Sequence, residues 1–360
     1  MSELIKIGIT HGDINGIGYE VIMKALADES ITEIFTPVIF GYRALAEEAK
    51  SMTGIPDIKL NVVADASKAL PGKINIVELK MPQPVLCPGE ITKEAGMAAV
   101  EALEMASDAF EKGDIDVIVT APISKEAAQN ETFNFPGQTE YFQQKFGDGE
   151  KAQMILFNDS LRVALLTVHL PLANVASQVT FENIVDSVER FSYTLKQDFG
   201  IVRPKIAVLS LNPHSGDGGL IGTEEENIII PALEELRENG ILAFGPFAAD
   251  GFFGHGDYKG FDGILAIYHD QGLAPFKTLA SGGGVNFTAG LPLIRTSPDH
   301  GTAFGIAWKN MADGSSMREA IYSAIDIWRR RESFQEAAAN PLKKYSSDRP
   351  DRGERQERPS

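Results

Sequence analysis

The sequence predicts an α/β fold with a largely parallel sheet, and three observations carry this prediction. Short apolar runs rich in β-branched residues alternate with longer amphipathic stretches along almost all of the 360 residues. Several of these runs are continuously apolar and end at Gly, Pro or Asp, which is typical of strands buried on both faces of a sheet. The chain is also too long for one ordinary core and fits two domains of typical size. We therefore expect two α/β domains built on parallel strands.

The predicted elements follow one another in a regular order. The strand-like runs are Ile5–Thr10, Pro37–Phe40, Ile74–Val77, Val117–Thr120, Val163–Val168, Ile206–Leu211 and Gly263–Tyr268. The clearest helical stretches are Ala95–Lys112, Phe181–Gln197 and Glu224–Asn239. A last helix is expected from near Ser316, because Ser316 and Glu319 have capping-box spacing. Residues 345–360 have almost nothing to bury, so this tail is predicted to be disordered.

Composition limits the possible partners. The formal net charge of −17 argues against nucleic acid, because binding phosphate backbones needs clustered Lys and Arg. A phosphorylated small substrate stays compatible with this charge, since a few basic groups in one pocket suffice. The single cysteine, Cys87, cannot form an internal disulfide, and the first residues lack the layout of a signal peptide. No apolar run reaches membrane-spanning length, and we expect a cytoplasmic protein that does not enter a membrane.

Three of the six histidines follow predicted strands. His169 comes after RVALLTV, His214 after IAVLSLNP, and His269 after GILAIY. In open α/β sheets the carboxyl ends of the strands form the edge where ligands bind. Three imidazoles with an open position would suit Zn²⁺ or another divalent transition metal. The alternative is that each histidine caps or packs a strand end, and spacing this long is no metal signature by itself.

Glycines mark the first turn and a second candidate loop. Gly12, Gly16 and Gly18 let the backbone after the first strand pass close to a ligand or to another strand, but their spacing is not the Rossmann fingerprint. The segment NPHSGDGG, residues 212–219, joins His214 to a flexible, polar turn.

A third segment, residues 281–303, is predicted to be a long functional loop. It contains Asn286 and Arg295, and Lys277 lies just before it. Lys277 and Arg295 would neutralise a phosphate or carboxylate, and Asn286 would orient it.

Six strings resemble the 4-hydroxythreonine-4-phosphate dehydrogenase family of the vitamin B6 pathway, and they occur in the family's order. They are GDINGIGYE (12–20), TAPISKE (120–126), FPGQTEY (135–141), LNPHSGDGGLIGTEE (211–225), YHDQGLAPFK (268–277) and GVNFTAGLPLIRTSPDHGTA (284–303). The resemblance extends from about residue 4 to about residue 335. It implies a two-domain fold like that of isocitrate and isopropylmalate dehydrogenases, with an active-site cleft between the domains. Residues 1–140 with 305–340 would form the first domain, and residues 141–304 the second, which carries the metal ligands.

The resemblance also implies roles for individual residues. His169, His214 and His269 match the ligands of one divalent metal (Zn, Mg or Co), one of them contributed across a homodimer. The positions that match substrate-binding residues are Gln138, Thr139, Lys277, Asn286 and Arg295. HGTA is similar to the adenine-side loop of isocitrate dehydrogenases, so His300, Gly301 and Thr302 are expected to bind NAD or NADP. Asp270 and Lys277 are the expected catalytic residues, and Asp250 is a further candidate for orienting a ligand or moving a proton.

The implied reaction is the oxidation of 4-phosphooxy-L-threonine at its secondary alcohol, with NAD or NADP accepting the hydride. The product, 2-amino-3-oxo-4-phosphooxybutanoate, is a β-keto acid that decarboxylates to 3-amino-2-oxopropyl phosphate, in pyridoxal 5'-phosphate biosynthesis. Two alternatives stay open. One is a related dehydrogenase of a threonate or erythronate phosphate, and the other is a metal-dependent lyase or hydrolase that uses the same histidines without a nicotinamide.

The chain departs from the family pattern at three places. Gln138 stands where the family usually has His, and an amide donates a hydrogen bond but carries no charge. Ile14 and Tyr19 stand where prolines are common. After HGTA, Gly305 and Trp308 replace the usual Asp and Gly, which bears on cofactor preference.

Overall fold

The computed structural model describes residues 4–55, 58–130, 133–280 and 283–339. The predicted disordered tail, residues 345–360, lies outside these residues. The strands are β1 (Lys6–Thr10), β2 (Thr36–Gly41), β3 (Leu60–Val63), β4 (Ile74–Glu78), β5 (Val117–Thr120), β6 (Gln153–Phe157), β7 (Arg162–Leu165), β8 (Lys205–Leu209), β9 (Leu242–Phe247), β10 (Gly263–Ala266), β11 (Val285–Ala289) and β12 (Arg295–Pro298). The α-helices are α1 (Gly18–Ala25), α2 (Arg43–Thr53), α3 (Lys93–Glu111), α4 (Lys125–Ala128), α5 (Gln138–Phe146), α6 (Phe181–Gln197), α7 (Ile230–Glu238), α8 (Ala249–Gly254), α9 (His269–Leu279) and α10 (Ser315–Ala339).

All twelve strands join in one sheet with the order β3-β4-β2-β1-β5-β12-β11-β6-β7-β10-β8-β9. Neighbouring strands are parallel except at the centre, where β12–β11, β11–β6 and β6–β7 are antiparallel. The prediction of an α/β fold with a largely parallel core is therefore confirmed. The sheet continues without a break through both predicted domains, and the domain boundaries and the cleft between them stay predictions.

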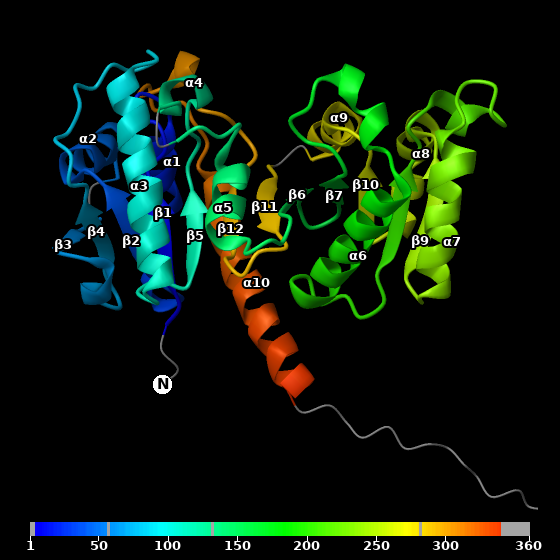
Figure 1. The fold of residues 1–360 in the computed structure, drawn as a ribbon. Helices are drawn as coiled ribbons and strands as arrows, with labels where there is room; N and C mark the ends of the chain where they lie inside the picture. Colours follow the sequence, from blue (N-terminus) through cyan, green and yellow to red (C-terminus); the bar gives the residue numbers. More distant parts are fainter. Residues whose placement is uncertain (1–3, 56–57, 131–132, 281–282, 340–360) are drawn as a thin grey trace, which may run out of the picture.

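Helices cover the sheet on both faces, as parallel strands require. In Figure 1, α3 stands in front of the sheet beside β1, and it also contacts β5, whereas α10 runs along the centre of the sheet and its last turns project beyond the body. The predicted helices at α3 and α6 are confirmed. The stretch predicted at 224–239 consists of a π-helical turn (Glu225–Ile229) followed by α7. The last helix begins one residue earlier than predicted, at Ser315, whose backbone N–H donates to the Asp313 carboxylate.

The prediction of a long loop over residues 281–303 is wrong. This segment forms β11 and β12, an antiparallel pair at the centre of the sheet. In β11, buried Val285, Phe287 and Ala289 alternate with polar Asn286 and Thr288, which is the pattern of a strand. These polar positions misled the prediction because neither faces solvent: Asn286 lines a pocket, and Thr288 is buried and accepts from Arg295.

The first turn is packed tightly against neighbouring backbone. Gly12 has a φ of +72°, and a Cβ on it would lie 2.3 Å from the carbonyl oxygen of Pro122, while a Cβ on Gly18 would meet the carbonyl of His11. Both glycines are therefore required by close backbone packing. Among the described residues, no helix has the length and apolar character needed to cross a membrane.

His11, at the start of this turn, makes stability depend on pH. Its ring is fully buried, stacked 5.2 Å from the ring of Tyr19, and burial lowers the pKa of His11 to about 4. The pKa of a histidine in the unfolded chain is about 6.5. Between pH 4 and pH 6.5, His11 is therefore protonated in the unfolded chain but neutral in the folded protein. The stability that His11 contributes is complete above about pH 6.5 and is lost as the pH falls toward 4.

We therefore expect the free energy of unfolding to fall by roughly 2 kcal/mol more in the wild type than in His11→Phe between about pH 7.5 and about pH 5. The Phe ring keeps the aromatic contact with Tyr19 but does not titrate. Urea denaturation of both proteins at both pH values measures the difference. The same pH dependence in the two proteins would contradict the neutral, buried state of His11.

Candidate active site

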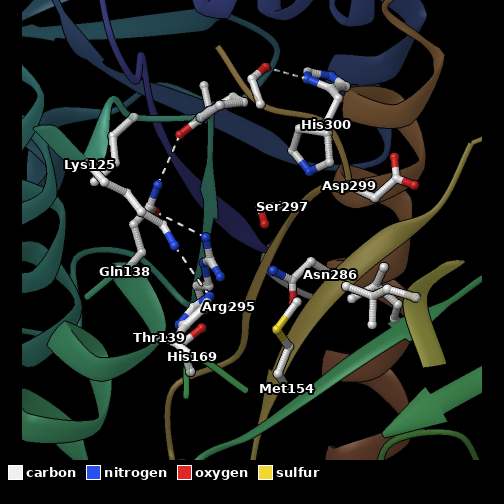
Figure 2. Close-up of a pocket in the computed structure, with 18 of the residues that line it drawn as sticks. Lys125, Gln138, Thr139, Met154, His169, Asn286, Arg295, Ser297, Asp299 and His300 are labelled. Carbon is white, nitrogen blue, oxygen red and sulfur yellow. Dashed lines mark hydrogen bonds between the residues drawn. The ribbon is translucent and has the colours of Figure 1, made fainter. Parts of the chain in front are cut away.

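A pocket of about 290 Å³ opens over the centre of the sheet (Figure 2). It is bounded by the chain that follows β5, the start of α5, one face of α9 and the segment that follows β12. The lining residues are Ala121, Pro122, Ile123, Lys125, Gly137, Gln138, Thr139, Met154, Leu156, His169, His269, Leu273, Lys277, Asn286, Arg295, Ser297, Pro298, Asp299, His300 and Gly301. Most of the residues predicted for metal, substrate and cofactor are therefore brought together in one place.

Strand register builds the floor of the pocket. Leu156 of β6 pairs with Asn286 of β11, which pairs in turn with Ser297 of β12. Since side chains alternate along a strand, Arg295, two residues before Ser297, lies on the same face. One row of neighbouring residues on three strands, Leu156, Asn286 and Ser297, therefore faces the pocket, and the guanidinium of Arg295 lies beside this row. Figure 2 shows Asn286 and Ser297 directed into the same space as Arg295.

Arg295 is a buried cation held by neutral groups. Its side chain is 3% exposed. Nε and Nη2 donate to the Thr120 hydroxyl at 3.0 and 2.6 Å, Nη1 donates to the Thr288 hydroxyl at 3.2 Å, and Nη2 donates to Gln138 Oε1 at 3.0 Å. Burial lowers the pKa of Arg295 to about 9, partly offset by the charge of Glu140, so the guanidinium stays protonated at neutral pH. A buried charge held only by neutral hydrogen-bond partners is suited to binding an anion.

The N-terminus of α5 lies beside Arg295. Gln138 and Thr139 are the first residues of this nine-residue helix, and both line the pocket. The first N–H groups of a helix have no partner within the helix and carry a partial positive charge, which favours an anion.

The side chain of Gln138 is engaged at both ends. Its Oε1 accepts from Arg295 at 3.0 Å, and its Nε2 donates to the Ala121 carbonyl at 3.2 Å (Figure 2). The sequence predicted contact between Gln138 and the substrate; the structure adds that this amide orients Arg295.

His169 stands between a carboxylate and an amine. Its Nδ1 lies 2.9 Å from Glu140 Oε1, and its Nε2 lies 3.3 Å from Lys125 Nζ. Because a carboxylate only accepts, Nδ1 carries the proton, and the lone pair of Nε2 accepts from Lys125 Nζ. Burial acts to raise the pKa of Glu140, but the hydrogen bond from His169 and the charges of His169 and Lys125 outweigh it and hold this pKa below its usual value.

His269 has the same arrangement one strand away. Its Nδ1 lies 2.7 Å from Asp270 Oδ1 and therefore carries the proton, so its Nε2 is the unprotonated nitrogen. The rings of His169 and His269 are 6.3 Å apart. His269, Leu273 and Lys277 recur every four residues, so one face of α9 lines the pocket. Lys277 Nζ donates to the Asp299 carbonyl at 3.2 Å.

His214 lies apart from this pocket in the described chain. All three histidines follow strands, as predicted, and the structure shows that these strands are adjacent: β8 is the parallel neighbour of β10, which itself neighbours β7. His214, however, is exposed, has a φ of +53° and is absent from the pocket lining. Over residues 4–339, apart from the short undescribed gaps, no three His, Cys, Asp or Glu side chains gather closely enough to hold a metal ion.

The predicted cofactor residues begin at the rim of the pocket. His300 and Gly301 line it, and Thr302 is the next residue of the chain. His300 Nδ1 lies 3.0 Å from the Gly301 carbonyl, so Nδ1 is the donor, and Nε2 is buried without a partner. Asn286 Oδ1 is also buried without a partner. Asp250 lies elsewhere, in the first turn of α8, where its carboxylate accepts from the N–H of Gly251.

Three polar residues at the pocket were not predicted from the sequence: Lys125 and Ser297, which line it, and Glu140, which contacts His169. All lie inside or next to the strings TAPISKE, FPGQTEY and TSPDHGTA, so the strings located them without revealing their contacts. The contact of Lys125 and Glu140 with His169 joins residues far apart in the chain, and no local pattern encodes it.

Comparison with known proteins gives a consistent result. Residues 33–324 match the family described as pyridoxal phosphate biosynthetic protein PdxA. The 4-hydroxythreonine-4-phosphate dehydrogenase of Bacteroides thetaiotaomicron is 51% identical over 340 residues, which cover 94% of this chain and 93% of that protein. The D-threonate 4-phosphate dehydrogenase of Cupriavidus necator is 40% identical over 335 residues, covering 92% of this chain and 100% of that protein.

A solved structure agrees with these relatives. The crystal structure of 4-hydroxythreonine-4-phosphate dehydrogenase from Klebsiella pneumoniae matches with a TM-score of 0.78 and 34% sequence identity. The match covers 91% of this chain and 99% of that one.

Proposed function

This chain belongs to the PdxA family of pyridoxal phosphate biosynthetic proteins, and we propose that it oxidises 4-phosphooxy-L-threonine with NAD or NADP as hydride acceptor. The product would be 2-amino-3-oxo-4-phosphooxybutanoate, which decarboxylates to 3-amino-2-oxopropyl phosphate. The observation that carries this proposal is the buried, charged Arg295 in a pocket that also holds two histidines with unprotonated Nε2 atoms, of which that of His169 lies 3.3 Å from Lys125 Nζ. The proposal includes a cytoplasmic location, as expected from the single cysteine.

The anionic end of the substrate is assigned to the Arg295 side of the pocket. Arg295 supplies a guanidinium already oriented by Thr120 and Gln138, and the first N–H groups of α5 add a partial positive charge. Lys277 would reach the same anion from α9. These groups fix the substrate at one end, so that its secondary alcohol is presented to the histidines.

The donor set fits a divalent metal. His169 and His269 each donate Nδ1–H to a carboxylate, the arrangement that orients metal-binding imidazoles and raises their basicity. When bound, Zn, Mg or Co would lower the pKa of the substrate alcohol and polarise the developing ketone. Asp270 would act by orienting His269.

One chain offers two of the three expected ligands. We assign the third to the partner's His214, because His214 is exposed and outside the pocket of its own chain. The proposal therefore requires a homodimer whose active sites lie at the subunit boundary.

The nucleotide is assigned to the side of the pocket formed by His300, Gly301 and Thr302. The buried, unpartnered Nε2 of His300 can accept from a donor, and a Cβ on Gly301 would meet no atom within 4 Å, so there is open space beside this backbone. NAD or NADP, when bound, would accept the hydride.

A second substrate calls for a direct comparison, since relatives of this chain include a D-threonate 4-phosphate dehydrogenase. The two substrates differ at C2, where threonine carries an ammonium group and threonate a hydroxyl group. An ammonium group must find an acceptor, and Asn286 Oδ1 is a buried acceptor without a partner. A hydroxyl group can also donate to this oxygen, so the preference for 4-phosphooxy-L-threonine rests on the 51% identity to a 4-hydroxythreonine-4-phosphate dehydrogenase, against 40% for the threonate enzyme. kcat/KM measured on both substrates tests the choice.

Gln138→His is expected to change kcat/KM for 4-phosphooxy-L-threonine by less than about tenfold, or roughly 1.4 kcal/mol. A neutral imidazole can also accept from Arg295, so the substituted protein keeps the hydrogen bond that orients the guanidinium. The test is to measure kcat/KM as a function of pH for the wild type and Gln138→His, on 4-phosphooxy-L-threonine and on D-threonate 4-phosphate. A much larger gain on 4-phosphooxy-L-threonine, with a new pH dependence near neutrality, would show that Gln138 marks a change of substrate.

A further inference from the structure

The segment after His300 is held in a strained backbone conformation. Ala303, Trp308 and Asn310 have φ values of +48°, +58° and +56°, in the left-handed region that side chains with a Cβ disfavour. Each such residue is strained, and a bulky residue such as Trp is a clear outlier in this region. Strain of this kind persists only where other contacts impose it.

The contacts of Trp308 impose this strained backbone conformation. Its Nε1–H donates to the Ile14 carbonyl at 2.8 Å, and its ring lies 6.4 Å from the ring of Tyr19 at 47°. Tyr19 is itself fixed, because it is buried, stacks on His11, and accepts a hydrogen bond from the Tyr42 N–H at 2.7 Å. The indole therefore rests on the rigid first turn of the chain.

A second contact ties the other end of the segment to the same turn. Ile17 N–H donates to the Thr302 carbonyl at 3.1 Å, and a Cβ on Gly16 would lie 2.8 Å from that oxygen. The chain between Thr302 and Trp308 is thus fastened at both ends. In between, a Cβ on Gly305 would meet nothing within 4 Å, so the middle of the segment is open on that side.

We propose that Trp308 is a positioning residue for the nicotinamide dinucleotide: by fastening residues 302–308 to the first turn, it holds His300 and Gly301 in the conformation that binds the nucleotide. The inference rests on the proposed function. A segment already ordered before binding loses less conformational entropy when the ligand arrives, so the nucleotide binds more tightly. Trp308 is not among the residues that line the pocket, so we expect its effect to be confined to the nucleotide.

Two substitutions separate the contributions of the indole. Trp308→Phe keeps an aromatic ring beside Tyr19 but removes the donor to Ile14. Trp308→Gly removes the ring and also relieves the backbone strain, since glycine adopts positive φ freely, so this variant is expected to fold. Trp328→Phe, at the other tryptophan of the chain, in α10, is the matched control.

Calorimetric titration of the metal-loaded proteins with NAD⁺ and NADP⁺ gives the nucleotide Kd directly. We expect Kd to rise about tenfold in Trp308→Gly and about threefold in Trp308→Phe, with Trp328→Phe unchanged. Amide hydrogen exchange over residues 300–310 should be faster in both Trp308 variants without nucleotide, and the KM for the phosphorylated substrate should stay within twofold of wild type.

Two results would overturn the proposal in distinguishable ways. A wild type that binds a nicotinamide nucleotide, with both Trp308 variants binding it within twofold of the wild-type Kd, would refute the role of Trp308 and leave the proposed function standing. A wild type that binds neither NAD⁺ nor NADP⁺ would refute the proposed function and this inference together.

Discussion

Arg295→Met is expected to lower kcat/KM for the phosphorylated substrate by a hundred- to a thousandfold, because losing one partner of a buried, hydrogen-bonded charge pair costs about 3–4 kcal/mol. Arg295 lies on the floor of the pocket with neutral partners, Thr120, Thr288 and Gln138, so the substrate anion would be its charged partner. The substitution removes the charge while keeping a side chain of similar length.

The same substitution separates binding from folding. A buried cation without a charged partner contributes little to stability, and an apolar replacement is often neutral or stabilising. The melting temperature of Arg295→Met should therefore not fall below that of the wild type. Arg295→Lys is the matched control: it keeps the charge, loses the planar fork, and should show an intermediate loss of activity. Activity of Arg295→Met within tenfold of wild type would refute the anion site.

His214→Ala is expected to abolish turnover without changing the melting temperature. His214 is exposed in the described chain, so its loss removes no packing within that chain, but the proposed metal site loses one ligand of three. Metal titration and steady-state kinetics on the same preparations measure both effects. Near-normal activity of His214→Ala in buffer containing a chelator would refute a catalytic metal at this site.

Two further variants calibrate that result. Glu140→Gln keeps all three ligands but replaces the carboxylate that orients His169, so metal affinity should fall about 10- to 100-fold and turnover should be restored by excess metal. His255→Ala removes an exposed histidine that is absent from the pocket lining, and it should change neither metal affinity nor turnover.

The sequence predicted most of the strands that are buried on both faces, although β3, β6 and β9 were not predicted. Runs such as those of β5 and β8 are apolar over most of their length and too short for helices, so they favour buried strands of a parallel sheet. β11 and β12 were not predicted as strands because one face of each contributes polar residues to the pocket. Asn286 and Arg295 line the pocket, which explains why these strand positions are polar. In the sequence alone, a buried strand with polar residues has the same pattern as a surface loop.

The sequence predicted most of the residues of the candidate site but not the hydrogen bonds between them. Three histidines after three apolar runs indicated one edge of the sheet, and the order β7-β10-β8 places those runs side by side. The bond between Gln138 and Arg295 joins residues 157 positions apart and depends on how α5 meets the sheet. The same holds for the contact of Trp308 with Ile14, which spans 294 positions, whereas the positive φ of Trp308 agrees with the Gly that the family usually has at this place.

The central claim is that the pocket oxidises 4-phosphooxy-L-threonine, and one measurement tests it most directly. Purified, metal-loaded protein is mixed with this substrate and with either NAD⁺ or NADP⁺, and reduced nucleotide is followed by its absorbance while the phosphorylated product is identified by mass. We expect one reduced nucleotide for each substrate consumed, with 3-amino-2-oxopropyl phosphate as the product and no reaction in chelator. A protein that turns over D-threonate 4-phosphate but leaves 4-phosphooxy-L-threonine unchanged would contradict this claim.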